Sequence, residues 1–257
     1  MQIIESIFSL FGSLLNNTKK LDLSKLPSQG KFYKDNFEIK IKTADLEDII
    51  DYEYNFDKEN VFLIVESIKK VVRKNIILPE PFLFDDIKSV DLVFLFLEIV
   101  KFTKKREIKV PYFNKRIGKE DSIEFNSKNF NYFDFTKYDF DNQTKEILIN
   151  GYRFSMPSIG IENNLTLFLA KKIKQGDDWQ NYIYDFLFFS GNKNHLSEDE
   201  LENLVLIFNF DMEESEKKTI QKIVNTFMKI VGYTLMVEGE IVEVKTKINL
   251  QTIWKES

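Results

Sequence analysis

Apolar residues recur at helical spacing through most of the chain and alternate with polar residues in a few shorter segments. The helical spacing predicts helices over residues 43–52, 57–74, 87–102, 157–173, 177–191, 197–210 and 211–232. Thr43, Asp57 and Ser197 stand at predicted helix starts, where a side-chain oxygen can accept from free backbone N–H groups. The segment 87–102 is apolar on nearly every side, so we expect it to be the central buried helix.

Alternating or extended segments predict strands near residues 37–41, 107–110, 122–125, 145–149, 152–156 and 233–244. The pair Asn150-Gly151 separates two apolar runs, which is typical of a type I′ β-hairpin, and a second hairpin is expected around Glu238-Gly239. These elements predict an α+β fold. It would be a mostly helical domain with a small antiparallel β excursion near 107–156 and a C-terminal β-hairpin.

The chain therefore divides into four parts: an amphipathic N-terminal arm (1–20), an N-terminal helical part (21–104), a β excursion (105–156) and a C-terminal helical part with a terminal hairpin (157–257). The arm carries seven apolar residues at helical spacing: Ile3, Ile4, Ile7, Phe8, Phe11, Leu14 and Leu15. It is too short to span a bilayer and lacks the basic start of a signal peptide. It could pack on its own domain or dock on a neighbouring subunit.

The stretch from Leu26 to Tyr33 is predicted to be a fixed turn. Pro27 disfavours helix at Leu26, and Gly30 adopts a positive φ at little cost. Phe32 and Tyr33 supply aromatic rings that the turn can bury. We expect Pro27, Ser28 and Gly30 to fix the direction of the arm.

Residues 129–141 are dense in aromatic and acidic side chains, among them Phe133, Phe135 and Tyr138. Proteins that stack single-stranded bases combine such aromatics with Lys and Arg, whereas the charged neighbours here are acidic. The pattern therefore favours a packed strand or a protein-binding loop.

Composition narrows the possible functions. The chain has 25 Phe and 10 Tyr in 257 residues, which indicates an aromatic core or extensive partner surfaces. With 36 Lys plus Arg against 41 Asp plus Glu, its net charge of -5 weighs against nucleic-acid binding as the main role. The basic clusters at 69–74 and 101–106 keep that role open as an alternative. The absence of Cys excludes disulfides and thiolate metal sites.

Residue chemistry favours a protein that is not an enzyme and that holds no cofactor or metal. His195 is the only histidine and stands in a polar loop, so a surface position is expected. The pairs Asp85-Asp86 and Asp177-Asp178 precede predicted helices, where capping explains them. The sequence has no glycine-rich phosphate loop and no nucleophile elbow. A hydrolase that uses Asp or Glu remains a weaker alternative.

Three segments resemble the baseplate hub assembly proteins of T-even-type contractile-tailed phages. The first runs Leu26-Pro27-Ser28-Gln29-Gly30-Lys31-Phe32-Tyr33 and matches the Leu-Pro-Ser-x-Gly-x-x-Tyr start of that family. The second is Asp86-Ile87-Lys88-Ser89-Val90-Asp91-Leu92, and the third is Phe154-Ser155-Met156-Pro157-Ser158. We call them the first, second and third motifs. Relatives in that family carry cysteine pairs, whereas residues 110–114 and 233–236 stand in their places here, so any such ribbons would be metal-free hairpins.

The resemblance implies a structural or assembly component of a phage tail baseplate, in its hub or wedge, without catalysis. Its partners would be other baseplate or tail hub proteins, with no small-molecule substrate, no membrane span and no main role for nucleic acid. It would act in the host cytoplasm during assembly and stay in the virion if retained. The candidate partner-binding residues are Ile4, Ile7, Phe8, Phe11, Leu15, Pro27, Phe32, Tyr33, Phe133, Phe135 and Tyr138.

Overall fold

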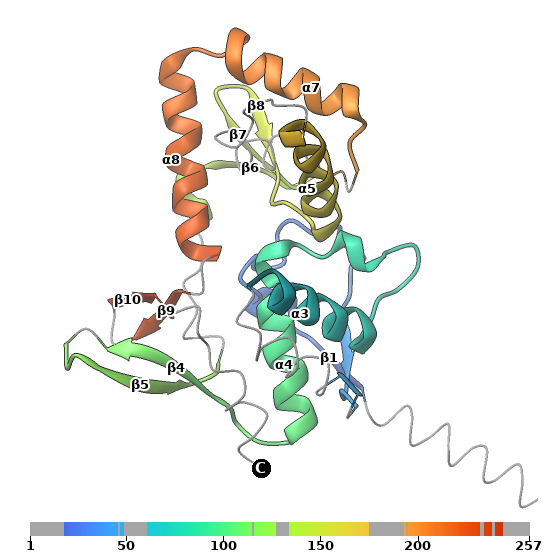
Figure 1. The fold of residues 1–257 in the computed structure, drawn as a ribbon, viewed down its shortest axis with the longest axis vertical. Helices are drawn as coiled ribbons and strands as arrows, with labels where there is room; N and C mark the ends of the chain where they lie inside the picture. The colour runs from blue at the N-terminus through green and yellow to red at the C-terminus, as the bar shows by residue number, and fades with distance from the viewer. Residues whose placement is uncertain are drawn as a thin grey trace, which may run out of the picture.

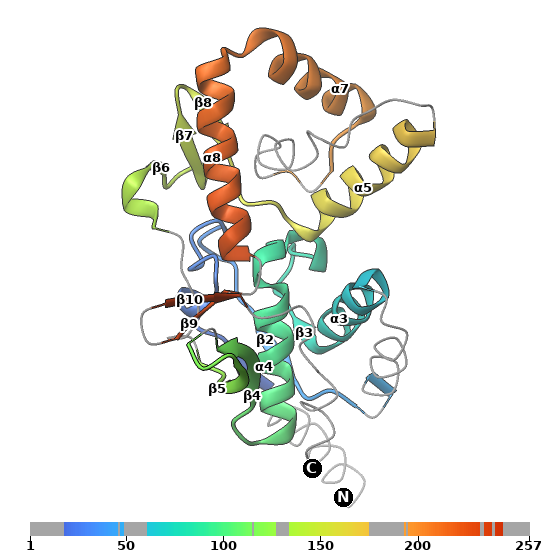
Figure 2. The same cartoon turned by 60° about the vertical axis from the view of Figure 1, so that its left-hand side comes forward.

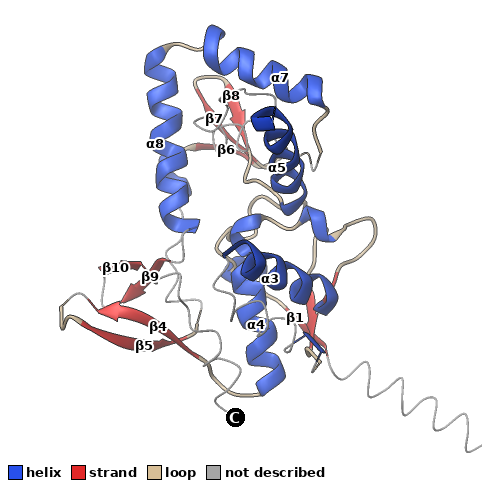
Figure 3. Ribbon diagram, in the orientation of Figure 1, coloured by secondary structure: helices blue, strands red, loops and turns tan. Residues whose placement is uncertain are grey.

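The structure is a computed structural model, and it describes residues 18–45, 47–48, 61–114, 116–126, 134–174, 193, 195–231, 234–237 and 240–243. The expected helix at 177–191 lies outside these residues, and of the one expected at 43–52 they include only 43–45 and 47–48. The described part confirms the α+β class, since several helices are combined with small antiparallel sheets (Figure 3).

The described helices are α3 (Val61–Asn75), α4 (Leu92–Lys104), α5 (Ile159–Lys174), α7 (Glu198–Leu206) and α8 (Glu214–Val231). One sheet contains β1 (Thr18–Lys20), β2 (Lys40–Lys42) and β3 (Ile76–Ile77), and another contains β6 (Asp139–Asp141), β7 (Glu146–Ile149) and β8 (Tyr152–Phe154). Two further pairs are β4 (Lys109–Asn114) with β5 (Lys119–Glu124), and β9 (Thr234–Val237) with β10 (Glu240–Glu243). Neighbouring strands run antiparallel in all four sheets.

The buried apolar side chains form two clusters, which correspond to two lobes (Figure 1). The first lobe contains α3, α4 and the β1–β3 sheet, and the second contains α5, α7 and α8 around the β6–β8 sheet. Helix α4 buries seven of its side chains in the first lobe, which confirms its predicted central place: Leu92, Phe94, Leu95, Phe96, Leu97, Ile99 and Val100.

Helix α4 begins at Leu92, five residues later than its apolar pattern predicts. Two short 3₁₀ turns, Phe84–Asp86 and Ser89–Asp91, precede it. The backbone between them bonds to other parts of the chain, because Ile87 accepts from Ile159 N–H and Ser89 N–H donates to Pro157. Those tertiary hydrogen bonds replace the helical ones, so the helix cannot extend backward.

The predicted hairpin at Asn150-Gly151 is confirmed. Strands β7 and β8 pair antiparallel, and both turn residues have positive φ, 51° at Asn150 and 85° at Gly151, as a type I′ turn requires. The strand expected at 37–41 is shifted to Lys40–Lys42, since a turn bonds Phe37 N–H to the Lys34 carbonyl.

The segment 105–156 does not form one unit in the structure. Ile108 directly precedes β4 and Phe125 directly follows β5, and both side chains are buried in the first cluster. Strand β4 also lies against β10 (Figure 2). Strands β6, β7 and β8 instead pack with the C-terminal helices in the second cluster. The two halves of the segment thus bury their apolar faces against different partners.

The capping box at Ser197 is confirmed, because Ser197 Oγ accepts from Glu200 N–H and the Glu200 carboxylate accepts from Ser197 N–H. Helix α7 is followed by a π-helix, Ile207–Asp211, and α8 begins at Glu214 where Asp211 was expected. The buried, extended residue Met212 separates the two helices. Anchoring that side chain in the second cluster explains the delayed start of α8.

Candidate functional site

The first motif lies between the two hydrophobic clusters. Phe32 is buried in the second cluster, whereas the next residue, Tyr33, is buried in the first, where its ring stacks on Phe37 at 4.1 Å. Adjacent side chains in an extended or turning backbone point in different directions, so one short segment contributes to both cores. The turn therefore joins the two lobes from the inside.

The turn is held by successive backbone hydrogen bonds, from Gln29 to Leu26 at 2.8 Å, Lys31 to Ser28 at 3.2 Å and Tyr33 to Gly30 at 3.3 Å. It places Gln29 and Gly30 at positive φ, 54° and 70°. A Cβ atom on Gly30 would lie 2.9 Å from Leu23 Cβ and 3.2 Å from the Leu23 carbonyl oxygen. Glycine is thus required at position 30 both by backbone conformation and by space.

The carboxylate of Asp91, in the second motif, accepts two hydrogen bonds from the first motif. Its side chain is 0% exposed, and Oδ1 accepts from Ser28 N–H at 2.8 Å while Oδ2 accepts from the Tyr33 hydroxyl at 2.7 Å. Tyr33 Oη in turn accepts from Lys88 N–H at 3.0 Å. Because every one of these groups is buried, each hydrogen bond satisfies an atom that water cannot reach.

The charges at this junction are perturbed by burial. Burial raises the pKa of Asp91 to about 6, although the hydrogen bonds from Ser28 and Tyr33 and the nearby Lys88 charge act in the opposite direction. Burial likewise lowers the pKa of Lys88 to about 8, against the attraction of Asp91 and Asp86. The pKa of the Tyr33 hydroxyl is raised by its burial and by the Asp91 charge, so Tyr33 stays a hydrogen-bond donor at neutral pH.

The third motif forms backbone hydrogen bonds with the second motif. Lys88 and Ser158 form an isolated antiparallel bridge, Ser89 N–H donates to the Pro157 carbonyl at 3.0 Å, and Ile159 N–H donates to Ile87 at 2.8 Å. Ser158 Oγ then accepts from Ile161 N–H at 3.3 Å, at the start of α5. The third motif thus fixes α5 of the second lobe against the backbone that carries Asp91.

A second polar group lies one helical turn further along α5. Burial raises the pKa of Glu162, opposed by the Ser89 hydroxyl and the Lys69 charge. The Ser89 hydroxyl lies beside this carboxyl without completing a well-formed hydrogen bond. Lys69 Nζ donates to Asn163 Oδ1 at 2.9 Å, which ties α3 to α5. The three motifs and their immediate neighbours therefore meet at one buried polar junction, which we call the motif junction.

Two rings of the aromatic segment 129–141 pack against Phe32 of the first motif. Phe32, Phe135 and Phe140 form a triangle of rings with centroids 5.3, 5.4 and 5.8 Å apart, and Lys31 Nζ lies 4.8 Å from the centroid of the Phe135 ring. Edge-to-face contacts of this kind stabilise packing by about 0.5–1.5 kcal/mol per pair beyond area burial. The turn and the aromatic segment are thus partners of each other.

This packing corrects part of the predicted partner surface. Pro27, Phe32, Tyr33 and Phe135 are buried within the chain, so they cannot serve as exposed anchors in this structure, and Tyr138 is half-buried against the second cluster. The remaining candidates lie outside the described residues: Ile4, Ile7, Phe8, Phe11, Leu15 and Phe133. These aromatic side chains, which suggested an interface, instead pack in the two hydrophobic clusters.

Sequence reasoning gave no special role to Asp91 or Ser158 beyond their places in the motifs. One signal could have identified Asp91: it is an acidic residue directly before the most apolar helix and between two apolar neighbours, Val90 and Leu92. A carboxylate in such a position requires buried donors. Nothing in the sequence indicates that those donors come from residues 28 and 33.

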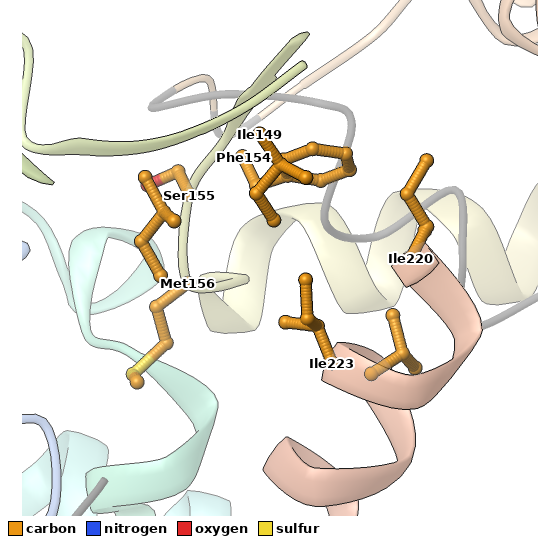
Figure 4. Close-up of a pocket in the computed structure, with 8 residues that line it drawn as sticks. Ile149, Phe154, Ser155, Met156, Ile220 and Ile223 are labelled. Carbon is orange, nitrogen blue, oxygen red and sulfur yellow. The ribbon is translucent and has the colours of Figure 1, made fainter. Parts of the chain in front are cut away.

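The described residues enclose a small apolar cavity between the β7–β8 hairpin and α8 (Figure 4). Its volume is about 10 Å³, and its wall includes Ile149, Phe154, Ile220 and Ile223. Such a space holds about one water molecule at most, and Ser155, the one polar residue in its wall, exposes no polar surface to it. His195 is exposed, and the described residues contain no group of three or more side chains that could hold a metal ion.

Several cations of the two basic clusters are paired within the chain. Lys74 Nζ lies 2.8 Å from Asp45 and 3.0 Å from Asp48, and Lys101 pairs with Glu107. The Arg73 guanidinium lies over the Phe84 ring at 4.5 Å and near Asp85. A nucleic-acid interface needs cations directed at phosphates, so these pairings weaken that alternative.

Comparison of the chain with protein-family models, with curated proteins and with solved structures found no match. Among the described helices, none combines the length and the apolar character that crossing a membrane requires.

Proposed function

We propose that the chain is a structural or assembly component of a contractile phage tail baseplate, in its hub or wedge. It acts through protein–protein interfaces, performs no reaction and takes no cofactor. It assembles in the host cytoplasm and belongs to the virion if it is retained after assembly.

One observation carries this proposal: the three segments that resemble the baseplate hub assembly family are far apart in sequence, yet they meet at the motif junction. Residues shared by chance would have no reason to converge. Here Ser28, Gly30 and Tyr33 of the first motif each have a specific structural task. Asp91 of the second motif accepts from Ser28 and Tyr33, and Ser158 of the third motif bridges Lys88 of the second. The resemblance thus concerns the residues that determine how the two lobes join.

The burial of the turn shifts the proposed partner contacts toward the N-terminal arm. Five apolar candidates remain there: Ile4, Ile7, Phe8, Phe11 and Leu15. An amphipathic segment that docks on another subunit is a common mode of recognition. The motif junction then serves as a rigid base that keeps the two lobes in a fixed relation while the arm engages a partner.

The test is a native mass measurement of the purified chain alone and after mixing with hub and wedge proteins of a contractile phage tail. We expect a defined complex with at least one of them. A chain that remains monomeric with every tail protein contradicts the proposal.

A variant without residues 1–15 separates the two roles of the arm. We expect it to lose partner binding while its circular dichroism and unfolding midpoint stay unchanged. A matched full-length variant, Phe8→Ser with Phe11→Ser, should lose binding in the same way. Unfolding of the truncated chain would show that the arm belongs to the core.

A further inference from the structure

An apolar patch with acidic neighbours lies where α7 gives way to α8. The side chains of Leu206 and Phe210 are 51% and 78% exposed. They stand four residues apart across the end of α7 and the π-helix, so they lie on one side of the helix. Asp211, Glu213 and Glu214 come next around Met212 and are exposed, and Glu214 also pairs with Lys217 on α8 at 3.2 Å. We call Leu206, Phe210, Asp211, Glu213 and Glu214 the acidic patch.

This exposure is unusual for residues of such size. Single exposed apolar side chains are normal on a protein surface, but adjacent ones with a charged rim are typical of interaction sites. The π-helix adds a second sign, because π-helical turns occur frequently at functional sites. The rim is acidic, so the partner that fits it should present an apolar side chain between cations.

The chain itself presents such a surface at the tip of the β4–β5 hairpin. Ile117 is 58% exposed, and Arg116 and Lys119 on either side of it are exposed too. Six residue pairs hold the two strands together, and Gly118 N–H donates to the Asn114 carbonyl at 2.9 Å across the turn. We call Arg116, Ile117 and Lys119 the basic tip.

The two surfaces cannot meet within one molecule. The corner between α7 and α8 lies at the top of Figure 1, whereas the β4–β5 hairpin lies at the lower left, beyond the opposite end of α8. A contact between them therefore requires two copies of the chain.

We propose that the basic tip of one copy docks on the acidic patch of a second copy. Ile117 would pack on Leu206 and Phe210, while Arg116 and Lys119 would face Asp211, Glu213 and Glu214. The contact joins different surfaces of the two copies, so it is head-to-tail and can continue into a ring or an open chain. This inference does not depend on the proposed function.

The contact is small. One apolar side chain, Ile117, packs on two, Leu206 and Phe210, with a few charge pairs at the rim. Interfaces of this size are transient, so we expect a dissociation constant on the order of 10 to 100 μM. The charge pairs lie at the solvent-exposed rim, so the association should weaken as the salt concentration rises.

Sedimentation velocity of the full chain over a range of concentrations provides the test. We expect the weight-average mass of the wild-type chain to rise with concentration at low salt. Phe210→Ser and Ile117→Ser should each remain monomeric, because each lacks one of the two surfaces. Leu83→Ser is the matched control, since Leu83 is also exposed but belongs to neither surface, and it should associate like the wild type.

Mixing the two defective variants tests the head-to-tail arrangement. Phe210→Ser keeps an intact basic tip and Ile117→Ser keeps an intact acidic patch, so an equimolar mixture should form dimers and nothing longer. A wild-type chain that stays monomeric at about ten times the upper expected dissociation constant overturns the proposal. Self-association that survives both substitutions, or that Leu83→Ser also abolishes, overturns it as well.

Discussion

Replacing Tyr33 with phenylalanine removes one buried oxygen atom from the motif junction and keeps the aromatic ring. The ring still stacks on Phe37 in the first cluster, so packing changes little. Two hydrogen bonds are lost, the one to Asp91 Oδ2 at 2.7 Å and the one from Lys88 N–H at 3.0 Å. The variant therefore isolates the polar part of the junction.

The size of the effect follows from burial. A hydrogen bond to a charged group contributes about 1.5–3 kcal/mol, and a buried N–H left without an acceptor costs about 1–3 kcal/mol. Loss of the hydroxyl also raises the pKa of Asp91 further, because that hydrogen bond favours the carboxylate, and protonation then relieves part of the cost. We expect the free energy of unfolding to fall by about 3 kcal/mol.

Equilibrium unfolding in urea, followed by circular dichroism, measures this loss. Tyr152→Phe is the control, because Tyr152 is a half-buried tyrosine on β8 that takes no part in the hydrogen bonds among Tyr33, Asp91 and Lys88. It should cost no more than about 1 kcal/mol. A loss for Tyr33→Phe below about 0.5 kcal/mol, or one equal to the control, would refute the argument that the hydrogen bonds of this hydroxyl stabilise the motif junction.

Three further substitutions test other parts of the fold. Gly30→Ala should destabilise the chain by about 2–4 kcal/mol, because positive φ and the contact with Leu23 both oppose a Cβ atom, whereas Gly118→Ala, at similar φ but with open space, should cost about 1 kcal/mol in the same urea titration. Asp91→Asn tests the pH dependence: the native pKa of Asp91 is about 6 against an ordinary 3.8, so its contribution to stability is full below about pH 4 and is lost as the pH rises through 6. The wild-type unfolding free energy should therefore fall relative to Asp91→Asn by about 2.5 kcal/mol between pH 4 and 7, and a difference that is constant over this range would show that Asp91 does not titrate as proposed. Val224→Ala enlarges the apolar cavity beside α8 and should cost about 1–3 kcal/mol in thermal unfolding, with a smaller loss indicating that α8 closes the space.

Local signals in the sequence predicted those elements whose cause is local. The Asn150-Gly151 turn and the Ser197 capping box each depend on backbone conformation or hydrogen bonds within a few residues. The apolar residues on nearly every side of α4 likewise predicted its central place, because a helix without a polar face has to be buried. Such features depend on residues that are close together in the sequence.

The boundaries that shifted have causes elsewhere in the chain. Helix α4 starts late because the backbone at 87–89 bonds to 157–159, and α8 starts late because Met212 is anchored in the second cluster. Burial of the candidate interface residues has the same origin, since Phe32 and Phe135 shield each other across about a hundred residues of sequence. Periodicity cannot show which distant segment will cover an aromatic ring.

The expectation that Pro27, Ser28 and Gly30 fix the direction of the N-terminal arm stays a prediction, because residues 1–17 lie outside the described residues. Strand β1 forms the last three residues of the arm, and it pairs with β2 through Lys19↔Ile41 and Lys20↔Lys40. Lys19 Nζ further contacts Glu98 on α4 at 2.7 Å. The end of the arm is therefore attached to the first lobe through the β1–β2 pairing and the contact with α4.

The turn at Pro27 acts one step earlier in this arrangement. By placing Tyr33 and Phe37 in the first cluster, it positions the segment that leads into β2, and β2 in turn positions β1. A change at Gly30 or Tyr33 would thus reach the arm only by loosening the first lobe. Damage to partner binding by such a variant should accompany lost stability, whereas changes within the arm should affect binding alone.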